Sequence, residues 1–202
     1  MKKIKIPYGK NVYGKEEVSA VINCLKRTTQ MSKNVLLFEK KVANIFNKKY
    51  GIMVNSGSSA ILLALKILNL KKGSEVIIPC LNFGTAISSL VISGLKPIFV
   101  DVDKYTLQID EKLITEKINK NTSAILVPNL IGNIPNWPSI RKIANKYNLK
   151  LIEDSADTLG AKINNKSTGN YSDMTITSFY GSHVISCAGN GGMLMLNSKK
   201  DY

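Results

Sequence analysis

The sequence predicts a three-layer α/β/α fold in which a mostly parallel sheet of about seven strands lies between two layers of helices. Two observations support this prediction. Short runs rich in Val, Ile and Leu alternate along the chain with segments of helical periodicity. Most of these runs are continuously apolar, which is typical of parallel strands that are buried on both faces. With right-handed crossovers, such an alternation covers both faces of one sheet.

The elements follow in order along the chain. Apolar residues three and four positions apart predict helices at 15–26, 36–47, 58–70, 84–93, 111–118 and 136–147. Apolar runs predict strands at 51–54, 75–79, 97–102, 124–128, 150–153, 174–179 and 192–196. We therefore expect residues 1–50 to form an N-terminal helical arm and residues 51–202 to form the sheet domain.

Composition narrows the class of protein. A chain of 202 residues with 44% hydrophobic content can bury a full core as one large domain. It has no apolar run long enough to span a membrane, and its basic N-terminus lacks the apolar segment of a signal peptide. Cys24, Cys80 and Cys187 are widely spaced, without the pairing of a metal site. These features indicate a cytoplasmic protein with reduced thiols and no metal.

The net charge of +14 raises the prospect of nucleic-acid binding. Against it, only Arg27 and Arg141 among the 28 basic residues are arginines, and the lysines are spread along the whole chain. Arginine is the side chain that most often makes paired hydrogen bonds to phosphates and base edges, and the sequence has no nucleic-acid recognition module. We expect no nucleic-acid partner, although the charge would attract an anionic sugar nucleotide.

Residues 55–60 (Asn-Ser-Gly-Ser-Ser-Ala) follow a predicted strand and open a long helix. Free backbone N–H groups and hydroxyls at a helix N-terminus form an anion site, which would involve Gly57, Ser58 and Ser59. Taken alone, the motif is better explained as an ordinary helix cap.

Two further groups of residues follow predicted strands. Asp154 and Asp157 lie at the end of the strand at 150–153, where a carboxylate can hold a cationic ring nitrogen or move protons. Capping of the next turn is the alternative explanation. Phe83 follows the strand at 75–79 and could stack on a planar cofactor or pack in the core.

Ser178 and His183 lie at and after the end of the strand at 174–179. Ser178 offers a hydroxyl for a phosphate. His183 is the only histidine of the chain, and imidazole is the side chain best suited to moving protons near pH 7. A lone histidine is usually not catalytic, but its place in a Gly/Ser loop at a strand end favours a function.

Taken together and in this order, these motifs resemble the DegT/DnrJ/EryC1/StrS family of sugar aminotransferases, which belong to fold type I of the pyridoxal-phosphate enzymes. The matching segments are residues 55–60, 75–79, 94–103, 152–154, 168–169, 178–180 and 191–192. The resemblance implies a cofactor, pyridoxal 5′-phosphate (PLP) or pyridoxamine 5′-phosphate (PMP), and places residues 51–202 in its large binding domain. It also implies a homodimer, and a smaller C-terminal domain that this chain lacks.

The resemblance also assigns roles to residues. Gly57, Ser58 and Ser178 would hold the cofactor phosphate, with Ser59 beside them. Phe83 would stack on the ring, and Asp154 would pair with the pyridinium nitrogen.

The position of the family's Schiff-base lysine is here His183, and the nearest lysines, Lys166 and Lys199, lie outside the motif. This resembles the GDP-4-keto-6-deoxymannose 3-dehydratase branch of the family, in which PMP binds without a covalent link. There the histidine moves a proton while the C3 hydroxyl of the sugar leaves. Asp157 agrees with that branch, since aminotransferase members typically have Gln or His there. A related branch uses an iron–sulfur cluster and has a cysteine where this chain has Ala156, so we expect no cluster.

The resemblance therefore implies removal of the C3 hydroxyl from a nucleotide-linked 4-keto-6-deoxyhexose, in deoxysugar biosynthesis for a cell-surface polysaccharide. Three alternatives stay open at this point: a nucleotide-sugar aminotransferase relative, an inactive cofactor-binding remnant, and a nucleotide-binding Rossmann protein. The absence of a Gly-x-Gly-x-x-Gly motif weakens the third. Residues 189–192 are Gly-Asn-Gly-Gly, whereas family members usually have Glu at the position of Asn190.

Overall fold

The central sheet has strand order β1-β9-β8-β5-β4-β2-β3 in the computed structural model, which describes residues 4, 6–7, 9–10, 12–27, 30 and 33–202. The strands, from one edge of the sheet to the other, are β1 (Tyr50–Val54), β9 (Gly192–Leu196), β8 (Met174–Ser178), β5 (Lys150–Asp154), β4 (Thr122–Pro128), β2 (Glu75–Pro79) and β3 (Lys96–Val100). In this sheet β9 runs antiparallel to both of its neighbours, and the remaining pairs are parallel. The predicted mostly parallel sheet is confirmed.

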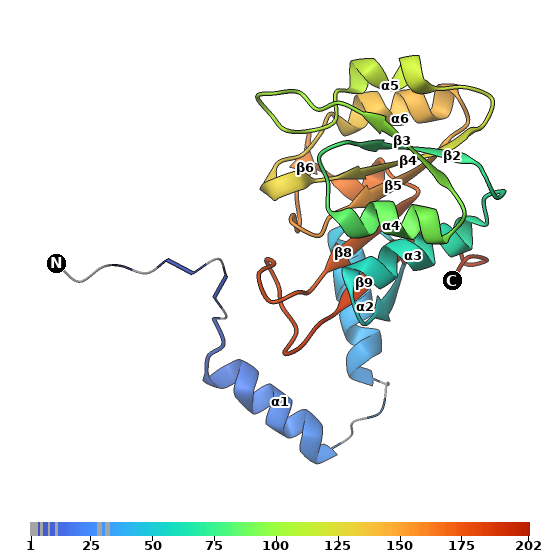
Figure 1. Ribbon diagram of the computed structural model, residues 1–202. Helices are drawn as coiled ribbons and strands as arrows, with labels where there is room; N and C mark the ends of the chain where they lie inside the picture. The colour runs from blue at the N-terminus through green and yellow to red at the C-terminus, as the bar shows by residue number, and fades with distance from the viewer. Residues whose placement is uncertain (1–3, 5, 8, 11, 28–29, 31–32) are drawn as a thin grey trace.

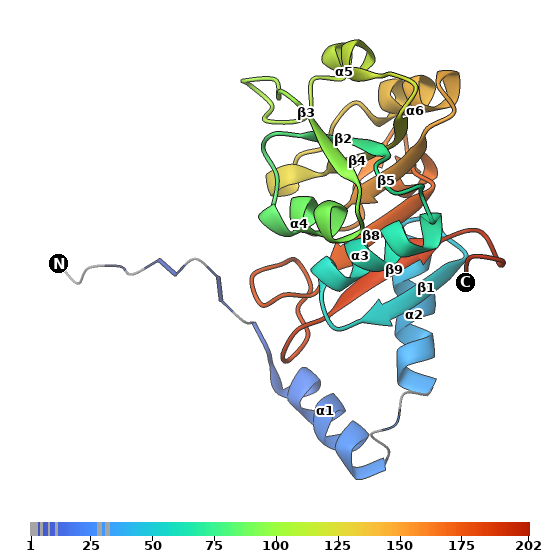
Figure 2. The same cartoon turned by 45° about the vertical axis from the view of Figure 1, so that its right-hand side comes forward.

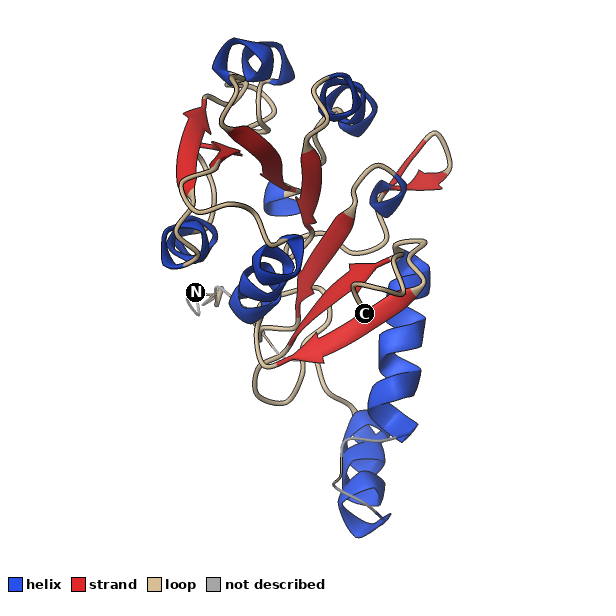
Figure 3. Ribbon diagram, turned by 90° about the vertical axis from the view of Figure 1, so that its right-hand side faces the viewer, coloured by secondary structure: helices blue, strands red, loops and turns tan. Residues whose placement is uncertain are grey.

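Helices cover both faces of this sheet, as Figure 1 shows. One face is covered by α3 (Gly57–Leu68) and α4 (Gly84–Ile92), and the other by α5 (Glu111–Lys117) and α6 (Trp137–Lys146). Successive residues of β2 divide between these layers, because side chains alternate across a strand. Val76 and Ile78 pack in the cluster with α3 and α4, whereas Ile77 packs with α5 and α6. Burial on both faces explains the unbroken apolar runs, and Figure 3 shows the helices on either side of the sheet.

The N-terminal helices differ in how they contact the sheet. Val42, Ala43 and Phe46, in and just after α2 (Lys33–Ile45), pack in one buried cluster with Met193 and Met195 of β9. By contrast, α1 (Lys15–Arg27) has no buried residue, and Figures 1 and 2 both show it extending away from the sheet. Part of the predicted helical arm lies outside the described residues.

Several bounds differ from those expected. The strand predicted at 97–102 ends at Val100, because Val102 forms only an isolated bridge with Ile109. The segment between β5 and β8 contains a small hairpin of β6 (Lys162–Ile163) and β7 (Lys166–Ser167), which the apolar pattern did not predict. Short 3₁₀ helices occur at η1 (Leu130–Gly132) and η2 (Thr168–Asn170). No helix in the described part of the chain is long and apolar enough to cross a membrane.

Candidate active site

A cavity of about 490 Å³ lies at the edge of the sheet where the parallel strands end. Ligands of open α/β sheets bind at this edge because the loops there are free to carry polar groups. Seven of the predicted site residues line the cavity: Gly57, Ser58, Phe83, Asp154, Asp157, Ser178 and His183. The eighth, Ser59, is not among the lining residues. Its main-chain N–H and its hydroxyl both contact Ser56 Oγ, at 3.1 and 3.0 Å, so Ser59 takes part in the helix cap.

The N-terminus of α3 closes one side of the cavity against β8 and β9. A Cβ added to Gly57 would lie 2.8 Å from the Cβ of Ser178, so only glycine lets the helix approach this strand end so closely. A Cβ on Gly192 would collide with the backbone of Ser56 in the same way. The first turn of a helix presents unpaired N–H groups and the positive end of its dipole. This corner therefore suits an anion.

Hydroxyl groups surround the same corner. Ser58 Oγ donates to Thr85 Oγ1 at 2.9 Å, and Ser178 Oγ accepts from the main-chain N–H of Tyr180 at 3.3 Å. These residues all line the cavity. The lining residues include neither lysine nor arginine in the described part of the chain. A phosphate bound here would therefore be held by N–H groups and hydroxyls rather than by a cationic side chain.

Asp154 is the last residue of β5 and is buried beneath the cavity. Its Oδ1 accepts from the N–H of Ala156 at 3.0 Å, and no cation pairs with it among the described residues. Burial raises the pKa of Asp154 to about 7, and the nearby charges of Asp157 and Glu153 act in the same direction. A buried carboxylate of this kind gains most from a cationic partner, such as a protonated ring nitrogen.

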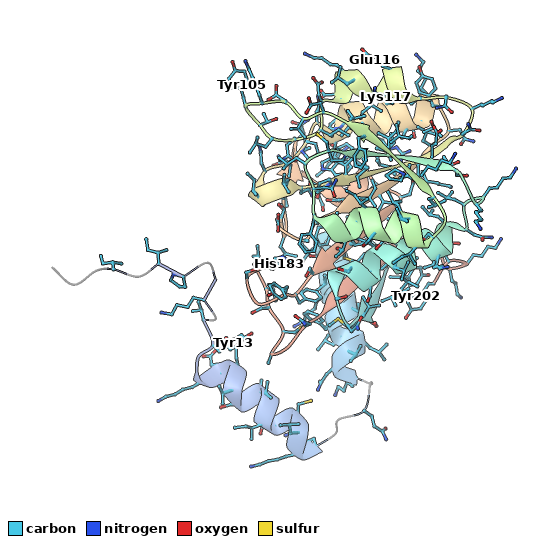
Figure 4. The ribbon with its side chains drawn as sticks, viewed as in Figure 1. Tyr13, Tyr105, Glu116, Lys117, His183 and Tyr202 are labelled. Atoms are coloured by element: carbon cyan, nitrogen blue, oxygen red, sulfur yellow. The ribbon has the colours of Figure 1, made fainter. Side chains whose placement is uncertain are left out.

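His183 lies on the loop between β8 and β9, where Figure 4 labels it. Its Nε2 is 3.7 Å from Asp157 Oδ1, while Asp157 Oδ2 accepts from the N–H of Ile131 at 3.1 Å. The second ring nitrogen of His183, Nδ1, is buried and has no hydrogen-bond partner in the described structure. The imidazole side chain is only 19% exposed. Its contacts therefore hold Nε2 near a carboxylate, while Nδ1 is enclosed by the protein.

Phe83 lies at the mouth of the cavity and is 69% exposed, so its ring is not part of the core. It precedes α4 in the N-cap position, but its side chain makes no capping hydrogen bond. The alternative that Phe83 packs in the core is therefore wrong. Stacking on a bound ring stays a prediction.

Several lining residues were not among the predicted site residues, including Asn129, Thr85, Tyr180 and Asn190. Asn129 follows β4 directly, so the rule that led to Asp154 could also have led to it. Thr85 and Tyr180 lie two residues beyond Phe83 and Ser178, close to motifs that were already recognised. Asn190 lies in the loop before β9, and its departure from the family's usual Glu was the sequence signal for it.

Comparison with known proteins identifies the family of this chain. The model of the DegT/DnrJ/EryC1/StrS aminotransferase family matches residues 11–201. The chain belongs to this family. Its fold is that of a solved member, the Escherichia coli GDP-4-keto-6-deoxy-D-mannose 3-dehydratase with bound hydrated PLP, with a TM-score of 0.92, 34% identity and coverage of 98% of this chain and 53% of that one. A second structure, NtdA from Bacillus subtilis with bound PMP, gives a TM-score of 0.85 at 31% identity, over 93% of this chain and 43% of that chain.

Curated members of the DegT/DnrJ/EryC1/StrS family with different activities are about equally similar in sequence. The GDP-4-keto-6-deoxy-D-mannose 3-dehydratase of E. coli O55:H7 is 34% identical over 98% of this chain and 53% of its own length. The GDP-perosamine synthase of E. coli O157:H7 is 35% identical over 96% of this chain and 54% of its own length. The chain thus spans about half the length of these relatives. Overall identity does not separate the two activities.

Proposed function

We propose that this chain is the cofactor-binding part of a PMP-dependent nucleotide-sugar 3-dehydratase. The observation that supports this most is the combination of His183 in the cavity with the absence of any lysine among the described lining residues. PLP-dependent aminotransferases hold their cofactor through a lysine Schiff base. A cavity that offers only an imidazole can bind the cofactor without a covalent link and move protons beside it.

The residues present fit PMP or PLP. The α3 N-terminus with Gly57, Ser58 and Ser178 would hold the phosphate, and the close approach of Gly57 to Ser178 leaves the corner open. Asp154 would keep the ring nitrogen protonated, and that pairing would return its raised pKa toward the ordinary carboxylate range. When bound, the cofactor supplies a conjugated ring that accepts the electron pair left when a proton leaves carbon.

His183 would act as the proton carrier in this site. Its imidazole lines the cavity with Nε2 3.7 Å from Asp157 Oδ1, so the ring lies where it could accept and return a proton. A histidine in place of the lysine favours loss of the C3 hydroxyl over transfer of an amino group, since it cannot take the cofactor back into a covalent link.

The substrate we propose is a nucleotide-linked 4-keto-6-deoxyhexose, because the relatives of known name act on nucleotide sugars. We further propose that the working protein is a homodimer. An aminotransferase would need another residue to replace the Schiff-base lysine, which the described lining residues do not offer.

The experiment combines the protein with PMP and GDP-4-keto-6-deoxymannose, using the CDP-linked sugar for comparison. The expected product is lighter than the substrate by one oxygen atom, because one equivalent of PMP would supply two electrons and be converted to PLP and ammonia for each sugar. Mass spectrometry detects this product. His183→Asn should abolish the product while PMP affinity stays within about threefold, because the imidazole is not a phosphate or ring-nitrogen ligand. A His183→Asn variant with undiminished product would contradict the role of His183. PMP binding without any product would favour the inactive cofactor-binding remnant, and failure of the wild-type protein to bind PMP would contradict the proposed cofactor site.

A further inference from the structure

Glu153, next to Asp154 on β5, is fully buried on the side of the strand away from the cavity. Its two carboxylate oxygens accept four hydrogen bonds from side chains, at 2.9 to 3.2 Å. The donors are Asn129, Ser155, Ser172 and Thr175. Four donors match the four lone-pair directions of an ionised carboxylate. The geometry is that of a buried negative charge with complete hydrogen bonding.

The cationic counterpart of Glu153 is Lys48, which lies between α2 and β1 and is 3% exposed. Its Nζ donates to the main-chain oxygens of Ser172 at 2.6 Å and Asp173 at 3.4 Å. The hydroxyl of Ser172 in turn donates to Glu153 Oε2 at 3.2 Å. Ser172 therefore bridges the two buried charges.

Burial of Lys48 does not favour folding. Desolvation lowers its pKa from 10.5 to about 8, although Glu153 and Asp173 act in the opposite direction, and Arg141 of α6 lowers it further. Because the unfolded chain keeps this proton to higher pH, burying the cation costs stability below pH 8, and that cost is relieved as the pH rises toward 10.5. Because the buried cation of Lys48 lowers the stability of the fold, we expect a function of Lys48 other than stabilisation.

The network reaches the cavity through Asn129. Its Nδ2 donates to Glu153 Oε1 at 2.9 Å and to Ser155 Oγ at 2.6 Å, and its main-chain N–H donates to Asp154 O at 2.8 Å. The indole N–H of Trp137 donates to Asn129 Oδ1 at 2.8 Å, so the amide group is fixed at both ends. Asn129 itself lines the cavity. The buried network thus holds the end of β4 against the end of β5.

We propose that Lys48 is a positioning residue of the cofactor site, which acts through Ser172 and Glu153 on Asn129 and Asp154. The inference rests on the proposed cofactor site and adds to it a residue outside the cavity. With Lys48 protonated, the charge of Glu153 is compensated, and Asp154 can ionise beside it to pair with a ring nitrogen. Loss of the Lys48 proton leaves Glu153 as an uncompensated charge, which disfavours ionised Asp154 and weakens cofactor binding.

Thermodynamic linkage gives a test that needs no mutation. If protonation of Lys48 strengthens PMP binding, then PMP binding must raise the titration midpoint of Lys48 by the same factor. NMR of the lysine-labelled protein, with Lys48 assigned by its absence in Lys48→Met, should show the midpoint rising by about one pH unit on saturation with PMP, which corresponds to a tenfold change in affinity. A midpoint that does not move while PMP binds would overturn the inference. If PMP does not bind at all, the proposed function fails first.

Variants provide a second test, with Lys49 as the matched control because it is the exposed neighbour of Lys48. At pH 7, Lys48→Met should bind PMP about tenfold more weakly than Lys49→Met. Between pH 7 and 9, wild type and Lys49→Met should share a pH dependence of PMP affinity that Lys48→Met lacks. The contributions from titration of PMP and Asp154 should remain in all three proteins.

If Lys48→Met does not fold, the Lys48→Met/Glu153→Gln pair removes both charges together and should restore folding. Its PMP affinity should then vary with pH only as far as PMP and Asp154 titrate. A pH profile of this double variant, or of Lys48→Met, that superimposes on the profile of Lys49→Met would overturn the inference.

Discussion

Glu153 and Asp154 are consecutive carboxylates on one strand, yet their surroundings are opposite. Glu153 accepts four hydrogen bonds within a closed polar network, whereas Asp154 accepts one, from the N–H of Ala156, and borders the cavity. Strand alternation places them on opposite faces of the sheet. The chain itself supplies all the hydrogen bonds of Glu153. Asp154 lacks a cationic partner, which a ligand could supply.

Both side chains are buried, so burial does not distinguish the structural carboxylate from the functional one. The number of hydrogen bonds that each accepts does. A buried ion with all its hydrogen bonds made gains nothing from a ligand, while a buried ion without a cation does. Burial raises the pKa of Asp154 to about 7, and the charges of Asp157 and Glu153 add to this effect. The following predictions test this contrast.

The largest effect is expected at Glu153. Glu153→Leu leaves four buried donors without an acceptor and Lys48 without its counter-charge, so the free energy of unfolding should fall by about 3–5 kcal/mol. Denaturant unfolding measures it. A loss below about 1 kcal/mol would mean that the network contributes little to the fold.

Asp154 should behave in the opposite way. Its folded-state pKa is raised from 3.8 to about 7, so the stability that the protonated form contributes is present below about pH 4 and is lost as the pH rises through 7. Asp154→Asn removes this loss and should stabilise the cofactor-free protein by about 1–3 kcal/mol at pH 8, and by much less at pH 5. The same variant should bind PMP more weakly than wild type.

Denaturant unfolding at the two pH values measures the change at Asp154. The contrast with Glu153 would fail if the stability gap between Asp154→Asn and wild type were the same at pH 5 and pH 8.

A smaller effect is expected at Asp157. Its pair with His183 is 3.7 Å long and partly exposed, so its contribution is of the order of a surface pair, about 0.2–1 kcal/mol. Asp157→Asn should therefore lower the rate of sugar dehydration by no more than about fivefold, with little change in stability. Asp103→Asn is the matched control, because that exposed carboxylate lies in the loop after β3. If Asp103→Asn lowered the rate as much as Asp157→Asn does, a role of Asp157 in the site would be contradicted.

Sequence pattern predicted the layers of the fold because burial on both faces leaves unbroken apolar runs in strands such as β2 and β4. It could not give the direction of β9, whose apolar run is the same for either direction of pairing. The β6–β7 hairpin was missed because its strands have two residues each and no apolar pattern. Its turn depends on Asn164 and Asn165, which both adopt positive φ.

The cavity-facing residues were predictable because they follow strand ends, and parallel strands bring those ends to one edge of the sheet. The Glu153 network was not predictable. Its members Lys48, Asn129 and Ser172 are far apart in the sequence, and none of them is unusual in type. Ser59 belongs to a recognised motif, yet the geometry of the cap turns it toward Ser56 rather than into the cavity.

The central claim is that the cavity binds its cofactor without a covalent lysine and that His183 stands where such a lysine would stand. The direct measurement is borohydride reduction of the PLP-treated protein, followed by peptide mass spectrometry, with unfolded protein as the reference for surface lysines. We predict that the wild-type protein binds PLP but shows no lysine modified above the reference, and that His183→Lys becomes modified at residue 183. Stoichiometric modification of a native lysine in the wild-type protein, or an unmodified residue 183 in a His183→Lys variant that binds PLP, would contradict the account.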